Sequence, residues 1–177
     1  NYYRQLLFMP KGKYCWYLLY CKVCEEKRAV QHLQNQGVES FYPVKSVAKV
    51  RKGVKSVKQE PLFPNYLFVS LNPKTANFNA IRSTRGVASF VRFGNAYATV
   101  ASVFVERLQQ QLAADTTVID NETLPKTGDE VLINEGIYQG LDAIFQSDDG
   151  LERSVLLIKM IEQQAILTID NKHFTKK

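Results

Sequence analysis

The sequence has no apolar run that approaches the ~18 residues needed to cross a membrane. The longest apolar runs, 16–21 and 155–161, have the length of strands or short buried helices. The apolar patch at 6–9 is too short for the core of a signal peptide. The three cysteines cannot all pair internally, because their number is odd. We therefore expect a cytoplasmic protein with reduced thiols and no membrane partner.

Motifs of catalysis and metal binding are also missing. The sequence has no P-loop, no GxGxxG and no GxSxG. Cys21 and Cys24 form a single C-x-x-C pair, with no second pair or nearby histidine to complete a tetrahedral zinc site. Paired carboxylates such as Asp148 and Asp149 are adjacent in sequence, so their side chains point apart. The sequence thus favours a binding protein over an enzyme and predicts no metal and no cofactor.

The charge of the chain is unevenly distributed. The net charge is +6, but residues 1–112 carry 17 basic and 5 acidic side chains, a balance of +12. Residues 113–177 carry 6 basic and 12 acidic side chains, a balance of −6. The first part should attract polyanions, and the second could lie against it and mask it. The alternative is that both are solvated surfaces of one domain.

A polar stretch separates these two parts. Residues 113–126 show neither helical nor strand periodicity and are long for a loop inside a compact domain, so we predict an interdomain linker there. The predicted domains are then 14–112 and 127–177. Residues 1–13 are interpreted as an extension and left out of the fold prediction. No internal repeat or low-complexity tract suggests any other division.

The first domain has a mixed pattern of helices and strands. Apolar runs predict strands at 16–21, 41–44, 66–71 and 90–93. Helical spacing predicts helices at 24–36, 77–83 and 101–112, and Gly37 ends the first of them. Valine alternating with lysine or serine over 46–59, around Lys52-Gly53, predicts a basic hairpin. We expect an α+β domain whose antiparallel or mixed sheet is flanked by helices.

The second domain fits two folds. Short strands at 130–134, 142–146, 153–159 and 165–169, separated by glycines, predict a small barrel. The leucine, isoleucine and methionine stripes in 141–145 and 156–165 equally suit two helices. Gly136 and Gly140 oppose the helical alternative by about 1 kcal/mol each. Periodicity does not decide between the two.

Two segments of the first domain have the composition of binding surfaces. The first helix carries Lys22, Lys27 and Arg28 near its start and His32 and Asn35 further on, with a second cationic segment at 82–85. Such side chains bind phosphates and base edges, although a basic helix face is often merely solvated. The segment 60–69 holds Phe63 and Tyr66 between prolines and could form an apolar patch with Phe93. These aromatics could equally be ordinary core residues.

Long blocks of the sequence resemble the NusG family of transcription elongation factors, and within it the specialised RfaH paralogues. These blocks are WYLLYCK at 16–22, EPLFPNYLFV at 60–69, TRGVASFVRFG at 84–94 and the KOW-like GDEVLINEGIYQGLDAIF at 128–145. The resemblance covers residues 14–177. After Gly150 the sequence LERSVLLIKMIEQQAIL departs from ordinary NusG and suits a helix. The resemblance implies a NusG N-terminal-like domain and a C-terminal domain that forms an α-helical hairpin when closed and a five-stranded KOW barrel when released.

The resemblance also implies roles for individual residues. A surface for the clamp helices of RNA polymerase would be formed by Phe63, Pro64, Tyr66 and Phe93. Contacts to the non-template DNA strand of a paused complex would come from Lys22, Arg28, His32, Gln36, Thr84 and Arg85. The interface between the domains would include Glu60, Arg153, Phe145, Leu157 and Met160, with an ion pair between Glu60 and Arg153. The run of threonines that contacts the polymerase gate loop in RfaH is replaced by Asn77-Phe78-Asn79-Ala80.

The implied function is that of an operon-specific elongation and antitermination factor, monomeric and autoinhibited by its C-terminal domain. On release, that domain would recruit a small-subunit ribosomal protein. The first alternative is a general, always-open NusG-like factor with a permanent barrel. The second is a ribosomal or RNA-binding accessory protein, since KOW domains also occur there.

Overall fold

An antiparallel sheet is the framework of the first domain in the computed structural model, which describes residues 14–114 and 128–174, with side chains for 14–114 and 136–166. The sheet order is β2–β5–β1–β6, and β9 pairs with β1 beyond the end of β6. The strands are β1 (Cys15–Cys21), β2 (Glu39–Phe41), β5 (Tyr66–Leu71), β6 (Val87–Phe90) and β9 (Thr99–Val100). Every pairing in the described part is antiparallel, which settles the choice that the sequence left open.

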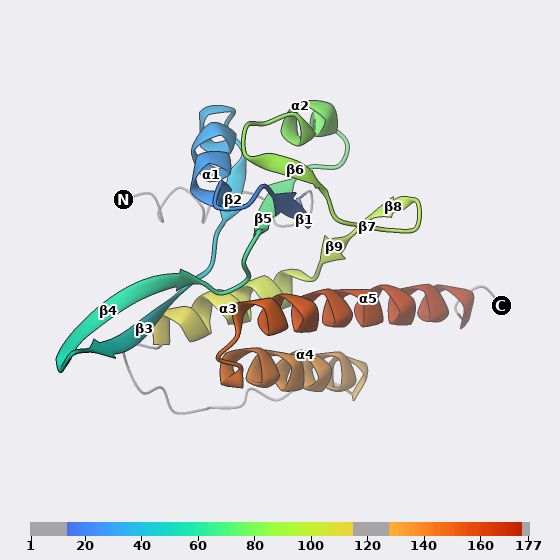
Figure 1. The fold of residues 1–177 in the computed structure, drawn as a ribbon. Helices are drawn as coiled ribbons and strands as arrows, with labels where there is room; N and C mark the ends of the chain where they lie inside the picture. The colour runs from blue at the N-terminus through green and yellow to red at the C-terminus, as the bar shows by residue number, and fades with distance from the viewer. Residues whose placement is uncertain (1–13, 115–127, 175–177) are drawn as a thin grey trace.

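Helices cover both faces of this sheet, because alternate side chains of a strand point to opposite faces. Tyr17 and Leu19 pack with α1 (Glu26–Asn35) and α2 (Phe78–Arg82). Leu18 packs in the cluster that includes α3 (Ser102–Ala114) and the C-terminal helices. Figure 1 shows α1 and α2 above the sheet and α3, α4 and α5 below it. The three predicted helices of this domain are confirmed, with ends shifted by one or two residues.

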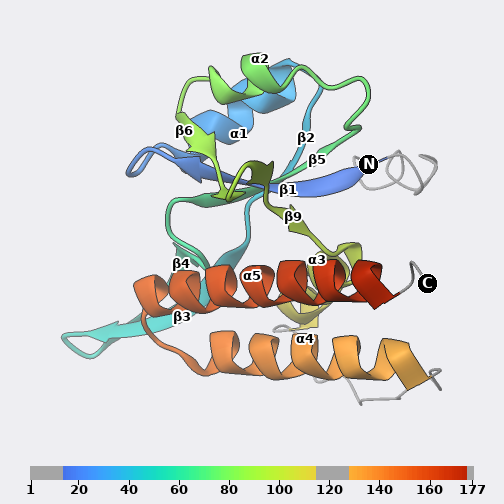
Figure 2. The same ribbon diagram turned by 90° about the vertical axis from the view of Figure 1, so that its right-hand side faces the viewer.

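The predicted basic hairpin is confirmed as β3 (Val44–Arg51) and β4 (Val54–Pro61), paired without a break. Lys52 and Gly53 both have positive φ, 52° and 77°, as a two-residue hairpin turn requires. The hairpin extends away from the body of the protein in both views (Figures 1 and 2). The pairing register places Lys45, Lys49, Arg51, Lys58 and Glu60 on one face, whereas Lys55 is the single cation of the other face.

Two of the predicted strands differ from those in the structure. The strand predicted at 41–44 is wrong, because β2 ends at Phe41 and β3 begins at Val44, on either side of Pro43. Proline lacks the N–H that a ladder needs, so it marks the break. The strand predicted at 90–93 is two strands, β6 and β7 (Arg92–Phe93). The latter pairs with β8 (Ala96–Tyr97) in a separate small hairpin.

The C-terminal segment is helical in this structure. It forms α4 (Gly128–Gln146) and α5 (Gly150–Phe174), which we call the helical hairpin. In both views α5 lies next to the sheet and α4 lies on its far side (Figures 1 and 2). Gly140, which counted against a helix in the sequence, has a packing role: a Cβ there would overlap the Met160 sulfur. The glycine therefore lets the two helices approach closely.

Two predicted segments lie mostly or wholly outside the described residues. These are the extension 1–13 and the linker 113–126, of which only 113 and 114 are described, as the end of α3. Among the described helices, none has the length and apolar character needed to span a membrane.

Candidate functional site

The segment between β4 and β5 lies beneath the helical hairpin. Leu62 and Phe63 are 0% exposed and share a cluster with residues of α3, α4 and α5. The C-terminal members of the cluster are Ile137, Leu141, Ile144, Leu157, Met160 and Ile161, with Phe145 packed at its margin. Tyr66 and Phe93 are half-buried against the same cluster. The structure thus gathers Phe63, Tyr66 and Phe93 on the side of the sheet that the helical hairpin covers.

Pro64 completes this group, which we call the docking surface (Phe63, Pro64, Tyr66 and Phe93). A Cβ on Gly150 would lie 2.8 Å from Pro64 Cγ, so the start of α5 fits against Pro64 only because residue 150 is glycine. The Ser154 hydroxyl donates to the Pro64 carbonyl at 3.4 Å. Burial, with a smaller contribution from Tyr20, raises the pKa of the Tyr66 hydroxyl above its ordinary value. The first turn of α5 therefore contacts the docking surface directly.

Tyr20 was missed by the sequence analysis. It pairs with Tyr66 across β1 and β5, and the two rings meet edge to face with centroids 5.3 Å apart. Tyr20 is 38% exposed, so this margin of the docking surface stays open while Phe63 is covered. The alternation of strand residues could have found it, since Tyr20 lies two positions from Leu18 on the same face.

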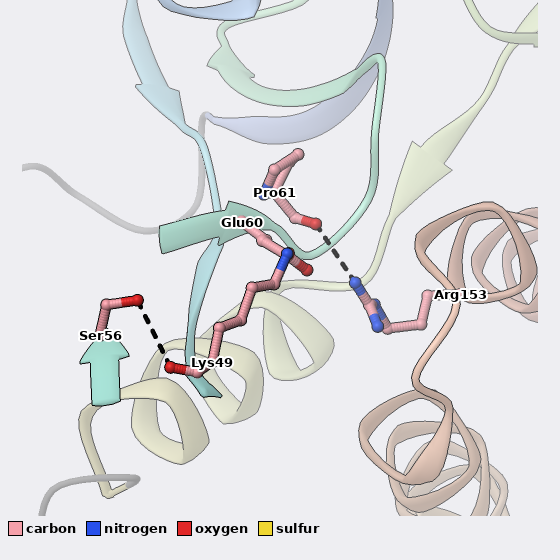
Figure 3. A network of polar contacts seen from close by, with 5 residues as sticks. All are labelled: Lys49, Ser56, Glu60, Pro61 and Arg153. Atoms are coloured by element: carbon pink, nitrogen blue, oxygen red, sulfur yellow. Dashed lines mark hydrogen bonds and ion pairs between the residues drawn. The ribbon is translucent and has the colours of Figure 1, made fainter. Parts of the chain in front are cut away.

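The interdomain ion pair predicted between Glu60 and Arg153 is absent from the described structure. Arg153 is only 2% exposed and donates from Nε to the Leu62 carbonyl at 2.8 Å. Its Nη1 donates to the Ser147 carbonyl at 2.8 Å and its Nη2 to the Pro61 carbonyl at 3.4 Å. The Glu60 carboxylate instead pairs with Lys49 at 2.7 Å (Figure 3). Arg153 still joins the two domains, but through backbone carbonyls.

Two further contacts cross between the domains. The Arg107 guanidinium of α3 lies 3.7 Å from the ring centroid of Tyr138 in α4, a cation–π arrangement. Burial lowers the pKa of Arg107. Lys45 of β3 donates to the Phe145 carbonyl at 3.4 Å, near the end of α4. That cation is favourably placed, because the carbonyl end of a helix carries partial negative charge and the last turn of α4 has no basic residue.

A second candidate surface lies on the opposite side of the sheet. We call it the basic helix face (Lys22, Arg28, His32, Gln36 and Arg85). All are exposed except His32, which is half-buried. The Arg28 guanidinium pairs with Glu25 at 3.0 Å. The Lys22 amide donates to the Gly86 carbonyl at 2.9 Å, which holds the Arg85 loop against the start of α1.

Thr84, predicted as a DNA contact, is buried at 6% exposure. Its hydroxyl accepts from Gln36 Nε2 at 2.9 Å and donates to the Ala80 carbonyl at 3.0 Å. Both bonds lie within the protein, so Thr84 positions Gln36 rather than presenting its own hydroxyl. The distinction follows from burial, which the spacing of residues 82–85 does not reveal.

Thr84→Val keeps the shape of the side chain and removes both hydrogen bonds. We expect it to lower the free energy of unfolding by about 1–3 kcal/mol. The Ala80 carbonyl loses the hydroxyl donor, and the Gln36 amide keeps only its bond to the His32 carbonyl. Urea denaturation measures this change. Thr84→Ser, which keeps the hydroxyl, should retain most of the stability. Equal stability of Thr84→Val and the unmodified chain would contradict this role.

The cysteines and acidic residues form no metal centre in the described part of the chain. Cys15, Cys21 and Cys24 are free thiols. Burial, with a smaller contribution from the Glu26 charge, raises the pKa of Cys21 to about 12, so this thiol stays protonated. Among the side chains of residues 14–114 and 136–166, no group of three or more histidine, cysteine, aspartate or glutamate residues is arranged to hold an ion.

Comparison with known proteins assigns the family. The family model described as transcription termination factor nusG matches residues 14–109. The NusG transcription termination/antitermination protein of Chlamydia trachomatis serovar D is 22% identical over 132 residues, covering 70% of this chain and 72% of its own. That of Neisseria meningitidis serogroup B is 20% identical over 140 residues, 78% of each chain. A solved structure of Thermotoga maritima NusG is also similar, with 23% sequence identity and a TM-score of 0.42. The match includes 66% of this chain and 70% of the Thermotoga chain. Because the family model spans more than half of the residues, the chain belongs to the NusG family of transcription termination and antitermination factors.

Proposed function

We propose that this protein is an operon-specific, autoinhibited elongation and antitermination factor of the RfaH type. The observation that carries the proposal is the burial of the docking surface by the chain's own helical hairpin. Phe63 is fully buried there, and Leu157 and Ile161 of α5 belong to the same cluster. A partner that needs Phe63 and Tyr66 can bind only after the helical hairpin leaves.

The partner of the docking surface is RNA polymerase, through its clamp helices. The helical hairpin already shows what this surface accepts, since two antiparallel helices present leucine, isoleucine and methionine to it. A helical coiled coil on a partner can compete for the same apolar contacts.

The basic helix face binds the exposed non-template DNA strand of a paused complex. It lies on the other side of the sheet from the docking surface, so both can be occupied at once (Figure 1). Lysine and arginine supply phosphate contacts, while the Gln36 amide, held by Thr84, supplies a group that can read base edges. Binding at this face shifts the population toward the open form if DNA favours that form.

Release would let the C-terminal segment form a KOW barrel and recruit a small-subunit ribosomal protein. Support comes from α5, whose outward face exposes Leu151, Val155 and Ile166 by 53–66%. Large apolar side chains left in water are available for a second packing arrangement. A switch of this kind requires two packings that differ by only a few kcal/mol. A general, always-open factor would not bury Phe63 under its own helices.

The first test is binding of the full chain to a reconstituted RNA polymerase elongation complex, paused with its non-template strand exposed. We expect tight binding to only some non-template sequences. Equal binding to all sequences would support the always-open alternative, and no binding would contradict both. Tyr66→Ala combined with Phe93→Ala should weaken binding at least about tenfold, as loss of aromatic contacts at an interface does. Val57→Ala, at a position 74% exposed on the β3–β4 hairpin, is the matched control.

A further inference from the structure

The charge of Arg153 is buried without a countercharge in hydrogen-bonding contact. The guanidinium is 2% exposed, and the acceptors found for it in the described structure are the carbonyls of Pro61, Leu62 and Ser147. Charge-assisted hydrogen bonds to carbonyls offset part of the cost of removing a cation from water. A nearby carboxylate would offset more of it. The closed arrangement, in which the helical hairpin covers the docking surface, thus contains an incompletely compensated cation.

A carboxylate that could supply this charge, that of Glu60, lines the same pocket as Arg153. Glu60 precedes Pro61, whose carbonyl Arg153 binds. Figure 3 shows the Glu60 carboxylate between the Lys49 amine and the Arg153 guanidinium. Glu60 bonds to Lys49 at 2.7 Å, and this bond holds the pKa of the Glu60 carboxyl below its usual range; the more distant Arg153 charge contributes least. The carboxylate is therefore ionised and is shared unequally between two cations.

We propose that Lys49 weakens the closed arrangement by holding the Glu60 carboxylate away from Arg153. Lys49 belongs to the first domain and stays with Glu60 whether or not the helical hairpin is in place. Arg153 lies near Glu60 only in the closed arrangement. The ion pair that Lys49 makes with Glu60 therefore reduces an attraction that would favour closure. Lys49 and Glu60 retain side-chain exposures of 51% and 29%. Glu60 and Arg153 line one open pocket, so the carboxylate has room to turn toward Arg153. The inference rests only on the autoinhibited part of the proposed function.

Lys49→Gln tests this proposal, with hydrogen exchange of the α4 and α5 amides as the readout. These amides exchange when the helical hairpin leaves the domain, so their rates follow the opening equilibrium. We expect exchange to slow by about two- to fivefold, the size of a partly exposed ion pair. The effect should vanish when Glu60→Gln is already present, because no carboxylate remains to be redistributed. Exchange in β1 and β5 reports whether the first domain is still folded.

Lys55→Gln is the matched control. It removes the same charge from the other face of the same hairpin, away from Glu60. Unchanged or faster exchange in Lys49→Gln overturns the proposal, as does an equal slowing in Lys55→Gln. The experiment uses neither polymerase nor DNA. Its failure is thereby distinguished from failure of the proposed function, which the elongation-complex binding measures.

Discussion

Leu157→Asp is expected to release the helical hairpin from the first domain and to permit polymerase binding without a DNA signal. Leu157 is 0% exposed in the cluster that contains Leu62 and Phe63. A carboxylate there would be buried without a partner, which costs about 3–5 kcal/mol. Release places the carboxylate in water, so the closed arrangement alone bears this cost. The ratio of open to closed protein should rise by roughly two to four orders of magnitude.

The measurement is binding of the full chain to core RNA polymerase that carries no exposed non-template strand. The unmodified protein should bind weakly and Leu157→Asp tightly. Val155→Asp is the matched control, because Val155 is 53% exposed on the same helix and a carboxylate there stays in water. Equal binding by all three proteins would contradict the autoinhibited model. NMR signals of Tyr66 and Phe93 should shift in Leu157→Asp alone, which shows directly that their surface has been uncovered.

The helices and the longer strands of the first domain could be predicted from sequence because their signals are local. Tyr66–Leu71 is a short apolar run bounded by turn residues, and it forms β5 as predicted. Lys52-Gly53 encodes the hairpin turn by itself. The C-terminal segment differs, since its leucines and isoleucines satisfy both a strand and a helix pattern. The helices pack on the apolar surface around Leu62 and Phe63, which lies about a hundred residues away in sequence and is invisible to periodicity.

The candidate sites, too, could be predicted only where the signal is local in the sequence. Prolines and aromatics in 60–66 indicated an apolar patch, although ordinary core aromatics remained an alternative, and its role in docking came only from the family resemblance. The prediction of an ion pair between Glu60 and Arg153 is wrong because Glu60 pairs with Lys49 instead. Sequence alone does not show which of two cations lies closer to a carboxylate. The family resemblance implied that Thr84 contacts DNA, but its hydroxyl is buried within the protein. Direction and burial of a side chain are tertiary properties, and each of these errors arises there.

Gly86→Ala is expected to disrupt the basic helix face and to destabilise the first domain. Gly86 has φ +90°, and an added Cβ would lie 2.7 Å from the Glu25 carbonyl oxygen and 2.9 Å from the Ala29 nitrogen. Both atoms are backbone at the start of α1, so they have no rotamer with which to move aside. Overpacking costs about 1–3 kcal/mol and a positive φ about 1–2 kcal/mol more. Urea denaturation should show a loss of about 2–5 kcal/mol.

Gly37→Ala separates the two contributions. Gly37 has φ +74° but open space around its Cα, so only the backbone penalty of about 1–2 kcal/mol applies. DNA binding should separate the variants further. The Gly86 carbonyl accepts from Lys22 N, so pushing this loop away from α1 displaces Lys22 and Arg85 together. Affinity for a single-stranded non-template oligonucleotide should fall in Gly86→Ala under conditions where both variants are folded. Equal affinity would mean that the loop does not position the basic helix face, and equal stability would mean that α1 yields to the extra methyl group.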